Sequence, residues 1–466
     1  MSLVRPGVWP WIGAILVLFV AAGAAAFFLP PTLFAAAFVG GVVILAWLVS
    51  PKVVIVLLLL VRSSIDGFME LFQLSFTAGL PLTMNLAGAM NSLAVGLGFL
   101  TLAQRLVRRQ PLLPTAPGWT YALFLAVCLP MIPGSVDPVA GVKEWARLAS
   151  GLAIYLMATE VVHDERQARR FTVVILASSL LPLAVGWLQR LTGSGYFFLG
   201  FVGTEFAYRP QGTFAHPGIL GSYLVIMLTM ATTAYFGAPS AARRAALIGW
   251  GAATAGCLAL TLARTEWLGF LVAMTVLGLL KQRRLAIMIL VCAAVLLASV
   301  PLLRERLTAT ESVFWRLDLW QAAYSLAWPP SFLGLGLGTS PWHVNQILPL
   351  VDSPPHNDYL KVLLETGLLA LLAYLGWLLA LLRHAWRAYC RTIDRQIAWR
   401  ALGLLAITAA GAVMSLSDNY LGHTAVQWYF WAFVALVPPS GTWPPGAACL
   451  WRPVSAGQAS DERIHP

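Results

Sequence analysis

Long runs of apolar residues are the feature that most constrains this chain. A helix that crosses the hydrocarbon core of a membrane needs about 20 mostly apolar residues. Of the 466 residues, 59% are hydrophobic and only 11% are charged, whereas a soluble domain carries about 25% charged residues. The pattern predicts an all-α polytopic membrane protein with about 14 (12–14) transmembrane helices. The candidate spans are residues 10–29, 32–50, 52–68, 82–103, 118–133, 145–162, 171–190, 217–237, 245–263, 266–280, 285–303, 362–382, 398–417 and 424–438.

The distribution of Lys and Arg predicts how these spans are oriented. With the N-terminus in the cytoplasm, 20 of the 30 Lys and Arg fall on the cytoplasmic side, which is the bias of short membrane loops. Acidic residues divide the other way, with 6 of 19 inside. Both termini are then cytoplasmic. Because the net charge of +11 is spread over such loops, we expect contact with membrane lipids and no nucleic-acid partner.

The domain organisation follows from the spans. Residues 1–438 are predicted to form a single transmembrane bundle, and 439–466, rich in Pro, Gly and polar residues, a loose cytoplasmic tail. One extracytoplasmic loop, 304–361, is much longer than the others, and long loops are usually functional or disordered. It contains four tryptophans and an amphipathic stretch at 314–327, so we expect it to fold onto the bundle. The third span is the weakest, because Arg62 and Asp66 interrupt it, and it is compatible with a re-entrant segment.

Polar residues at membrane depth are costly and suggest function, and here they gather at the outer ends of helices. The first such segment is 209–218. Arg209 offers a guanidinium fork suited to phosphate, and Gly212 would let a ligand approach the backbone closely. Pro217 suits the start of a helix, whose N-terminus favours anions. An Arg that merely extends to the membrane surface from an ordinary turn explains the segment equally well.

The second segment, 262–267, is the tight outer turn before the span at 266–280. Arg264 either pairs locally with Glu266 or faces the same anion as Arg209. Arg304, Arg306 and Arg316, in the long loop, could guide an anionic substrate or contact solvent and lipid head groups.

The third segment, 354–367, ends the long loop. His356 could act as a general base near neutral pH. Alternatively, Asn357 or Asp358 caps a helix, and Lys361 pairs with Glu365 four residues later. Both interpretations can hold together.

Several motifs are absent from the sequence. It has no Asp-x-Asp, His-Glu-x-x-His, Cys-x-x-Cys or Walker motif, and the glycines at 334, 336 and 338 do not form a phosphate-binding loop. We therefore expect no cofactor, no metal site and no direct use of ATP. The five cysteines show neither metal-binding spacing nor a disulfide pattern.

Taken together, the segments resemble the O-antigen ligase and O-antigen (exopolysaccharide) polymerase superfamily of bacterial membrane glycosyltransferases. The resemblance covers about residues 200–380. It is carried by Arg-x-x-Gly-Thr-Phe-x-x-Pro at 209–217, the arginine turn at 264, Arg-x-x-x-Trp and Gly-x-Gly-x-Gly within 316–338, and His-Asn-x-x-Leu-x-x-x-x-Glu-x-Gly at 356–367. The turn at 264 departs from the family, since it is Ala-Arg-Thr-Glu where the family often has Ser-Arg-Gly.

The resemblance implies a GT-C-like, metal-independent, inverting glycosyltransferase of the bacterial inner membrane, with its active face in the periplasm. It implies an undecaprenyl-pyrophosphate-linked glycan as donor and a glycan or lipid A–core as acceptor. In this scheme His356 is the catalytic base, Arg209, Arg264 and Arg316 bind the pyrophosphate, and Gly212, Asn357 and Glu365 support the site.

Two family activities and one other class remain open. A polymerase extends the lipid-linked glycan, with a chain-length regulator as a further partner, whereas a ligase moves the finished glycan to lipid A–core. The span count and the segment Arg62-Ser-Ser-Ile-Asp66 slightly favour a polymerase. A flippase for lipid-linked glycans would instead favour repeated halves and polar groups near the bilayer midplane.

Overall fold

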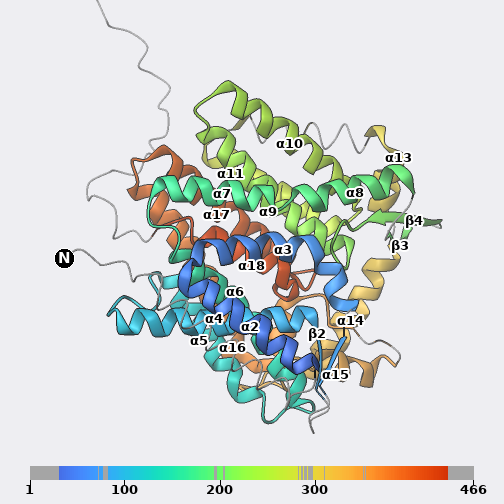
Figure 1. Ribbon diagram of the computed structural model, residues 1–466. Coiled ribbons are helices and arrows are strands. Elements are labelled where there is room, and N and C mark those ends of the chain that lie inside the picture. The colour runs from blue at the N-terminus through green and yellow to red at the C-terminus, as the bar shows by residue number, and fades with distance from the viewer. Residues whose placement is uncertain are drawn as a thin grey trace, which may run out of the picture.

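The computed structural model describes residues 31–71, 73–76, 82–193, 197–202, 205–281, 283–284, 287, 291, 298–308, 310–349, 351 and 353–438. The predicted first span, most of the predicted span at 285–303 and the tail at 439–466 lie outside the described residues. Within them, helices dominate and run side by side as a bundle (Figure 1).

The bundle is built from helices whose bounds follow the apolar runs. They are α2 (Pro31–Val49), α3 (Pro51–Leu71), α4 (Leu86–Val107), α5 (Ala116–Cys128), α6 (Pro138–Thr159), α7 (Glu165–Ala177), α8 (Leu180–Thr192), α9 (Pro217–Gly237), α10 (Ala241–Leu260), α11 (Arg264–Leu280), α16 (Asp358–Arg391), α17 (Arg395–Met414) and α18 (Thr424–Val434). Two 3₁₀ turns, Leu129–Met131 and Tyr420–Gly422, lie between them.

The middle of the bundle is formed by α9, α17 and α18. All eleven residues of α18 are buried, and α9 and α17 are buried over most of their length. Aromatic rings fill the core around α18: Trp431 lies with its centroid 4.8 Å from Tyr121 of α5 and 5.6 Å from Trp377 of α16. Such dense aromatic packing buries large areas and holds the neighbouring helices in one arrangement.

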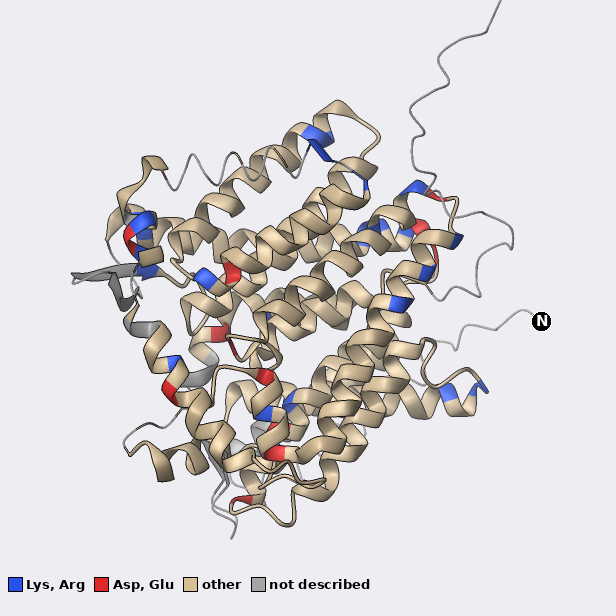
Figure 2. Ribbon diagram, turned by 180° about the vertical axis from the view of Figure 1, so that it is seen from behind, with Lys and Arg blue, Asp and Glu red and all other residues tan. Residues whose placement is uncertain are grey.

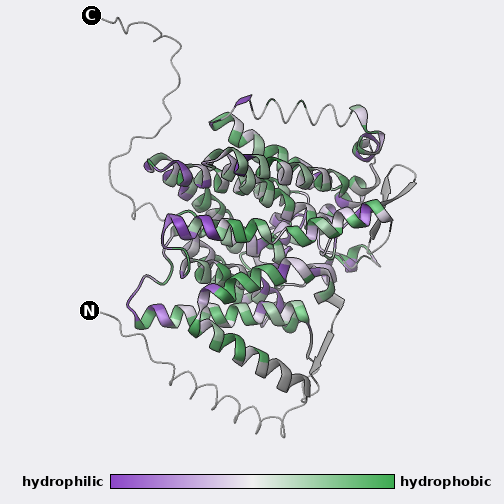
Figure 3. Cartoon of the chain, turned by 45° about the horizontal axis from the view of Figure 1, so that its top comes forward, coloured by the Kyte–Doolittle hydropathy of each residue, from purple (hydrophilic) through white to green (hydrophobic). Residues whose placement is uncertain are grey.

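Five described helical stretches are long and apolar enough to cross a membrane. They are Leu86–Val107, Glu165–Thr192, Pro217–Gly237, Asp358–Arg391 and Arg395–Met414. The hydrophilic residues lie mainly towards the helix ends (Figure 3). These helices agree with an all-α membrane protein; the count of 14 spans and their orientation stay predictions.

Two predicted spans differ in detail from the structure. The span predicted at 171–190 is divided into α7 and α8, which continue in one direction across the bundle (Figure 1). The break falls at Ser178 and Ser179, whose hydroxyls bond backbone carbonyls within α7 and so compete with regular helical pairing. The weak third span is a helix, α3, that departs from helical geometry only at Ile65. Its charges are paired, since Arg62 and Asp66 form a buried ion pair of 3.0 Å.

Two β-hairpins were not predicted. Strand β1 (Gln73–Phe76) pairs antiparallel with β2 (Leu82–Asn85), and β3 (Phe197–Val202) with β4 (Glu205–Pro210). Both lie at the same end of the bundle as the long segment 304–361 (Figure 1). That segment contains α14 (Glu311–Ala327) and α15 (Ser340–Ile347) and begins within α13 (Pro301–Thr308). Helix α14 packs against α16, so the segment folds onto the bundle.

Candidate active site

Arg209 is fixed by the turn between α10 and α11. It stands near the end of β4 with 6% of its surface exposed, and its Nε donates a hydrogen bond to the Thr261 carbonyl oxygen (2.7 Å). The first polar segment is thereby held against the second, although 52 residues separate the bonded pair. After Arg209, the chain turns into α9, which begins at Pro217 as the sequence predicts.

Arg264 is the first residue of α11 and follows a strained turn. Leu262, two residues earlier, has a φ of +53°, which is uncommon for a residue other than glycine. Arg264 Nη1 donates to the Arg306 carbonyl oxygen (3.2 Å), and Arg306 Nε donates back to the Leu262 carbonyl oxygen (3.0 Å). These two bonds connect the turn to α13.

The guanidinium groups of Arg264 and Arg316 both lie close enough to Arg209 for their charges to act on it. Burial lowers the pKa of Arg209 to about 10, and the charges of Arg316 and Arg264 act in the same direction, against the carboxylate of Glu266. Concentrated positive charge of this kind is suited to an anion that carries more than one negative charge. The structure therefore brings together the three arginines that the sequence analysis proposed as a group.

His356 lies just before α16 in a constrained conformation. Its φ of +48° is in the left-handed region, and such strain often accompanies functional sites. The imidazole Nδ1 is 3.3 Å from Asp418 Oδ1, and Nε2 is 3.4 Å from the Ser353 hydroxyl. The Trp315 ring lies 5.2 Å away, centroid to centroid. Since Trp315 precedes Arg316 on α14, this contact brings the long segment beside His356.

Asp418 is the functional candidate that the sequence analysis missed. It lies between α17 and α18, is 7% exposed, and its Oδ2 is 3.8 Å from Nε2 of His423. Burial would favour its neutral form, but His423 and His356 hold the pKa of Asp418 well below its usual value. The signal in the sequence was a polar run, Ser417-Asp418-Asn419, between two apolar spans at the predicted outer face.

Asn357 and Glu365 hold the backbone around His356. The Asn357 side chain caps α16 by accepting from the Leu360 amide (3.1 Å), and it donates to the Leu416 carbonyl oxygen (3.0 Å). The capping interpretation is confirmed, and the second bond places the Asp418 loop beside His356. Glu365 accepts from the amides of Gly338 (2.9 Å) and Ser340 (3.1 Å), so it fixes the glycine run to α16.

Gly212 and Lys361 each have a tertiary contact that the sequence did not indicate. A Cβ on Gly212 would lie 2.7 Å from the Pro182 carbonyl oxygen, so close packing against α8, together with a φ of +60°, explains the glycine without any ligand. Lys361 lies 4.0 Å from Glu365 but only 2.6 Å from Glu144 of α6. Its main partner is therefore 217 residues away, where sequence spacing cannot reveal it.

His216, the residue that precedes α9, lies near Arg209 and Asp418. Its Nδ1 accepts from the Gly218 amide (3.0 Å), which caps the helix. Burial lowers the pKa of His216 to about 4, and the charge of Arg209 adds to this effect. His216 is therefore neutral at neutral pH and structural in role.

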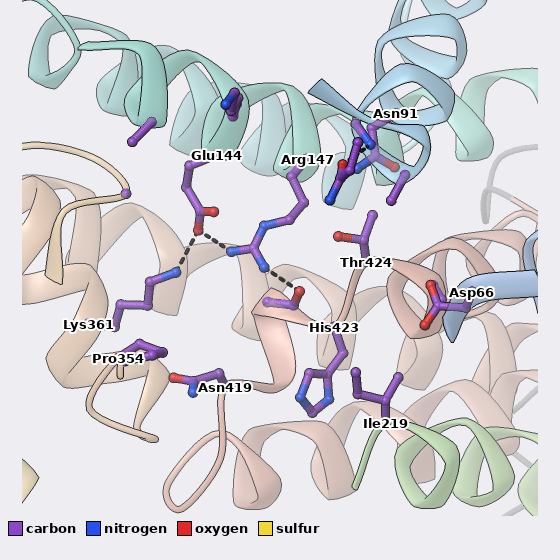
Figure 4. A pocket seen from close by; sticks show the side chains of 18 of the residues that line it. Asp66, Asn91, Glu144, Arg147, Ile219, Pro354, Lys361, Asn419, His423 and Thr424 are labelled. Atoms are coloured by element: carbon purple, nitrogen blue, oxygen red, sulfur yellow. Dashed lines mark hydrogen bonds and ion pairs between the residues drawn. The ribbon is translucent and has the colours of Figure 1, made fainter. Parts of the chain in front are cut away.

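A polar cavity of about 640 Å³ is lined by Asn419 and His423, among other residues (Figure 4). Asn419 directly follows Asp418 in the chain, so the cavity lies next to the Asp418 loop. Lys361 and Arg147 both bind Glu144 in its wall, and the His423 ring, which lies beside Asp418, also lines it. Among the described residues, Asn91 Oδ1 and His423 Nδ1 are buried without a hydrogen-bond partner. Buried polar atoms are normally paired, so the cavity offers groups that a polar ligand can satisfy. The volume is within the range of small-molecule sites.

Over the described ranges, no group of three or more His, Cys, Asp and Glu side chains is arranged to hold a metal ion. The expectation that the reaction uses no metal stays a prediction.

Part of the sequence around these residues matches a known protein family. Residues 249–375 match the sequence profile of the family described as O-antigen ligase, and no curated protein matches the chain. The matched range contains Arg264, Arg316, His356 and Glu365, but neither Arg209 nor Asp418. The family supports a role in O-antigen or polysaccharide assembly, with a glycosyltransferase-like activity that uses a lipid-linked glycan and an acceptor. Residues 249–375 therefore match a domain of the O-antigen ligase family, which supports the resemblance seen in the sequence motifs.

Proposed function

We propose that this membrane protein transfers a glycan from undecaprenyl pyrophosphate to an acceptor sugar hydroxyl, on the periplasmic side of the bacterial inner membrane. The observation that supports this most is that Arg264 and Arg316 act on Arg209, while Arg316 follows Trp315, whose ring lies beside His356 of the His356–Asp418 pair. We place the reaction in O-antigen or exopolysaccharide assembly, with polymerase favoured over ligase.

In the proposed reaction, the acceptor oxygen attacks the anomeric carbon of the donor sugar. The bond from that carbon to the phosphate oxygen breaks, and undecaprenyl pyrophosphate leaves with the bonding electrons. The three arginines stabilise the negative charge that develops on the leaving group, the role that a metal ion has in other glycosyl transfers. A single displacement of this kind inverts the anomeric configuration.

His356 takes the proton of the acceptor hydroxyl in this scheme. Because Asp418 is ionised, it favours a hydrogen on the facing Nδ1, which leaves the lone pair on Nε2. Nε2 then removes the proton as the new bond forms. Asp418 is a positioning residue: it orients the ring and stabilises the imidazolium.

The polar cavity is our candidate for the acceptor subsite. One of its lining residues, His423, lies beside Asp418. The cavity also contains the buried polar atoms of Asn91 and His423 that have no hydrogen-bond partner, and sugar hydroxyls could bond to them. Arg62 and Asp66 also line it. Arg62 and Asp66 are the first and last residues of the segment Arg62-Ser-Ser-Ile-Asp66, which resembles polymerases. In this proposal the segment contributes to binding of the acceptor.

Asn91→Leu should raise the KM for the acceptor about tenfold, because one lost buried hydrogen bond is worth about 1.4 kcal/mol, or a factor of ten. The donor KM should stay unchanged. Steady-state kinetics with each substrate varied in turn measures both. Gln104→Leu is the matched control, since it makes a similar change on α4 away from the cavity. A rise in the donor KM alone would contradict the assignment.

Asp418→Asn should lower kcat/KM. The pKa of the carboxylate is depressed, so Asp418 is ionised and accepts the hydrogen on Nδ1 of His356. An amide in its place no longer selects the tautomer that leaves the lone pair on Nε2. We expect a rate loss on the order of 10²-fold, at the lower end of what general-base catalysis contributes.

The matched control for Asp418→Asn is Asp394→Asn, at the cap of α17. Asparagine also serves as a cap, so this variant should keep the wild-type kcat/KM. A normal kcat/KM in Asp418→Asn would remove Asp418 from the mechanism.

The function itself is tested with the full-length protein in lipid nanodiscs, supplied with an undecaprenyl-pyrophosphate-linked repeat unit. A ladder of longer lipid-linked glycans would establish a polymerase. Transfer of one glycan to added lipid A–core, without a ladder, would establish a ligase. If neither product forms and the donor instead crosses the bilayer of sealed vesicles, the enzyme proposal is wrong and the protein is a flippase.

A further inference from the structure

A second hollow of about 650 Å³ opens far from the candidate active site. It lies between α7, the end of α9, the start of α10 and the start of α17, with Phe433 of α18 beneath. Five of its lining residues are arginines and none is acidic: Arg166, Arg169, Arg170, Arg243 and Arg400. We call this hollow the arginine groove.

The arginine groove lies one membrane thickness from Arg209. Helix α9 begins at Pro217, beside the Arg209 segment, and its last residue, Gly237, lines the groove. Its 21 residues span about 30 Å at 1.5 Å per residue, which equals the hydrocarbon core of a bilayer. Seen from behind, Lys and Arg gather at this end of the bundle (Figure 2). The groove therefore lies at head-group level on the opposite membrane surface.

The charges of the groove are only partly compensated. Arg400 pairs with Glu165, and Arg169 approaches the same carboxylate at 3.7 Å. Over the described part of the chain, no carboxylate lies within ion-pair distance of Arg166, Arg170 or Arg243. One carboxylate for five guanidinium groups leaves a strong excess of positive charge around the opening.

Apolar side chains continue from the arginines into the groove. The lining includes Val173, Leu176, Met230, Leu247 and Phe433, and Val173 is exposed. A free phosphate ion would use the guanidinium forks but not this apolar strip. A phospholipid uses both, since its head group needs forks and charge and its acyl chain needs an apolar surface.

We propose that the arginine groove binds an anionic phospholipid of the surrounding membrane, with the phosphate among the arginines and an acyl chain along the apolar strip. The occupant is identified by charge complementarity and by the position of the groove at head-group level. The proposal does not depend on the glycosyl-transfer reaction, which takes place at the other end of α9.

The test measures binding of phosphatidylglycerol and phosphatidylcholine to the full-length protein in detergent, by native mass spectrometry. The groove variant combines Arg169→Gln, Arg170→Gln and Arg243→Gln. The control variant combines Arg383→Gln, Arg387→Gln and Arg391→Gln, which neutralises three exposed arginines in the last turns of α16, outside the groove. Thermal unfolding without lipid shows whether both variants are folded.

We expect the groove variant to bind phosphatidylglycerol at least tenfold more weakly than the wild type, and the control variant to bind it normally. Phosphatidylcholine should bind weakly to all three proteins. Equal weakening in both variants would mean general surface attraction and would overturn the proposal. So would complete displacement of the lipid by millimolar inorganic phosphate, or tighter groove-dependent binding of undecaprenyl pyrophosphate, which would make the donor lipid the ligand.

Discussion

Replacing His356 with alanine should lower kcat by about 10²- to 10⁴-fold, the range that a general base contributes. The substitution removes the group that takes the proton from the acceptor hydroxyl in the proposed scheme. It leaves the arginines in place, so the KM for the donor should change little. The measurement is single-turnover transfer with the lipid-linked donor, which separates the chemical step from product release.

His343→Ala is the control for this prediction. His343 lies on α15 in the same long segment, where its Nε2 is 3.4 Å from the Leu335 carbonyl oxygen, and it has no role in the proposed site. It should retain wild-type turnover. Normal turnover in His356→Ala would exclude His356 as the base and leave the His356–Asp418 pair with a structural role only.

Arg209→Ala should lower kcat/KM for the donor by about 10²- to 10³-fold, which is typical for the loss of one group that stabilises developing charge. Because Arg209 Nε also bonds the Thr261 carbonyl oxygen, the turn before α11 loses an anchor as well. Product inhibition separates these effects. If Arg209 binds the leaving group, the inhibition constant for undecaprenyl pyrophosphate should rise by a similar factor.

Two further variants sharpen this second test. Arg209→Lys keeps the charge but lacks the planar fork, so we expect an intermediate loss. Arg190→Ala removes an exposed arginine from the last turn of α8 and should leave both constants unchanged. Unchanged product inhibition in a folded Arg209→Ala protein would show that Arg209 is a structural residue.

The class of fold, and the end of the bundle at which the candidate residues lie, follow from the sequence alone. An apolar run of about 20 residues can satisfy its backbone in a membrane only as a helix. Successive crossings return the chain to alternate surfaces, so counting spans was enough to group Arg209, Arg264 and His356 at one end. Local rules also predicted the start of α9 at Pro217 and the cap at Asn357, because helix ends depend on neighbouring residues.

Which side chains touch one another depends on the tertiary structure. Asp418 lies beside His356 across 62 residues, and Glu144 binds Lys361 across 217. Gly212 is required by the Pro182 carbonyl of a neighbouring helix. These contacts depend on how helices are rotated and packed against one another, and that choice is made by the interlocking of the whole core. Periodicity and capping describe one helix at a time, so they placed the candidate residues at one end of the bundle but could not reveal the partners of those residues.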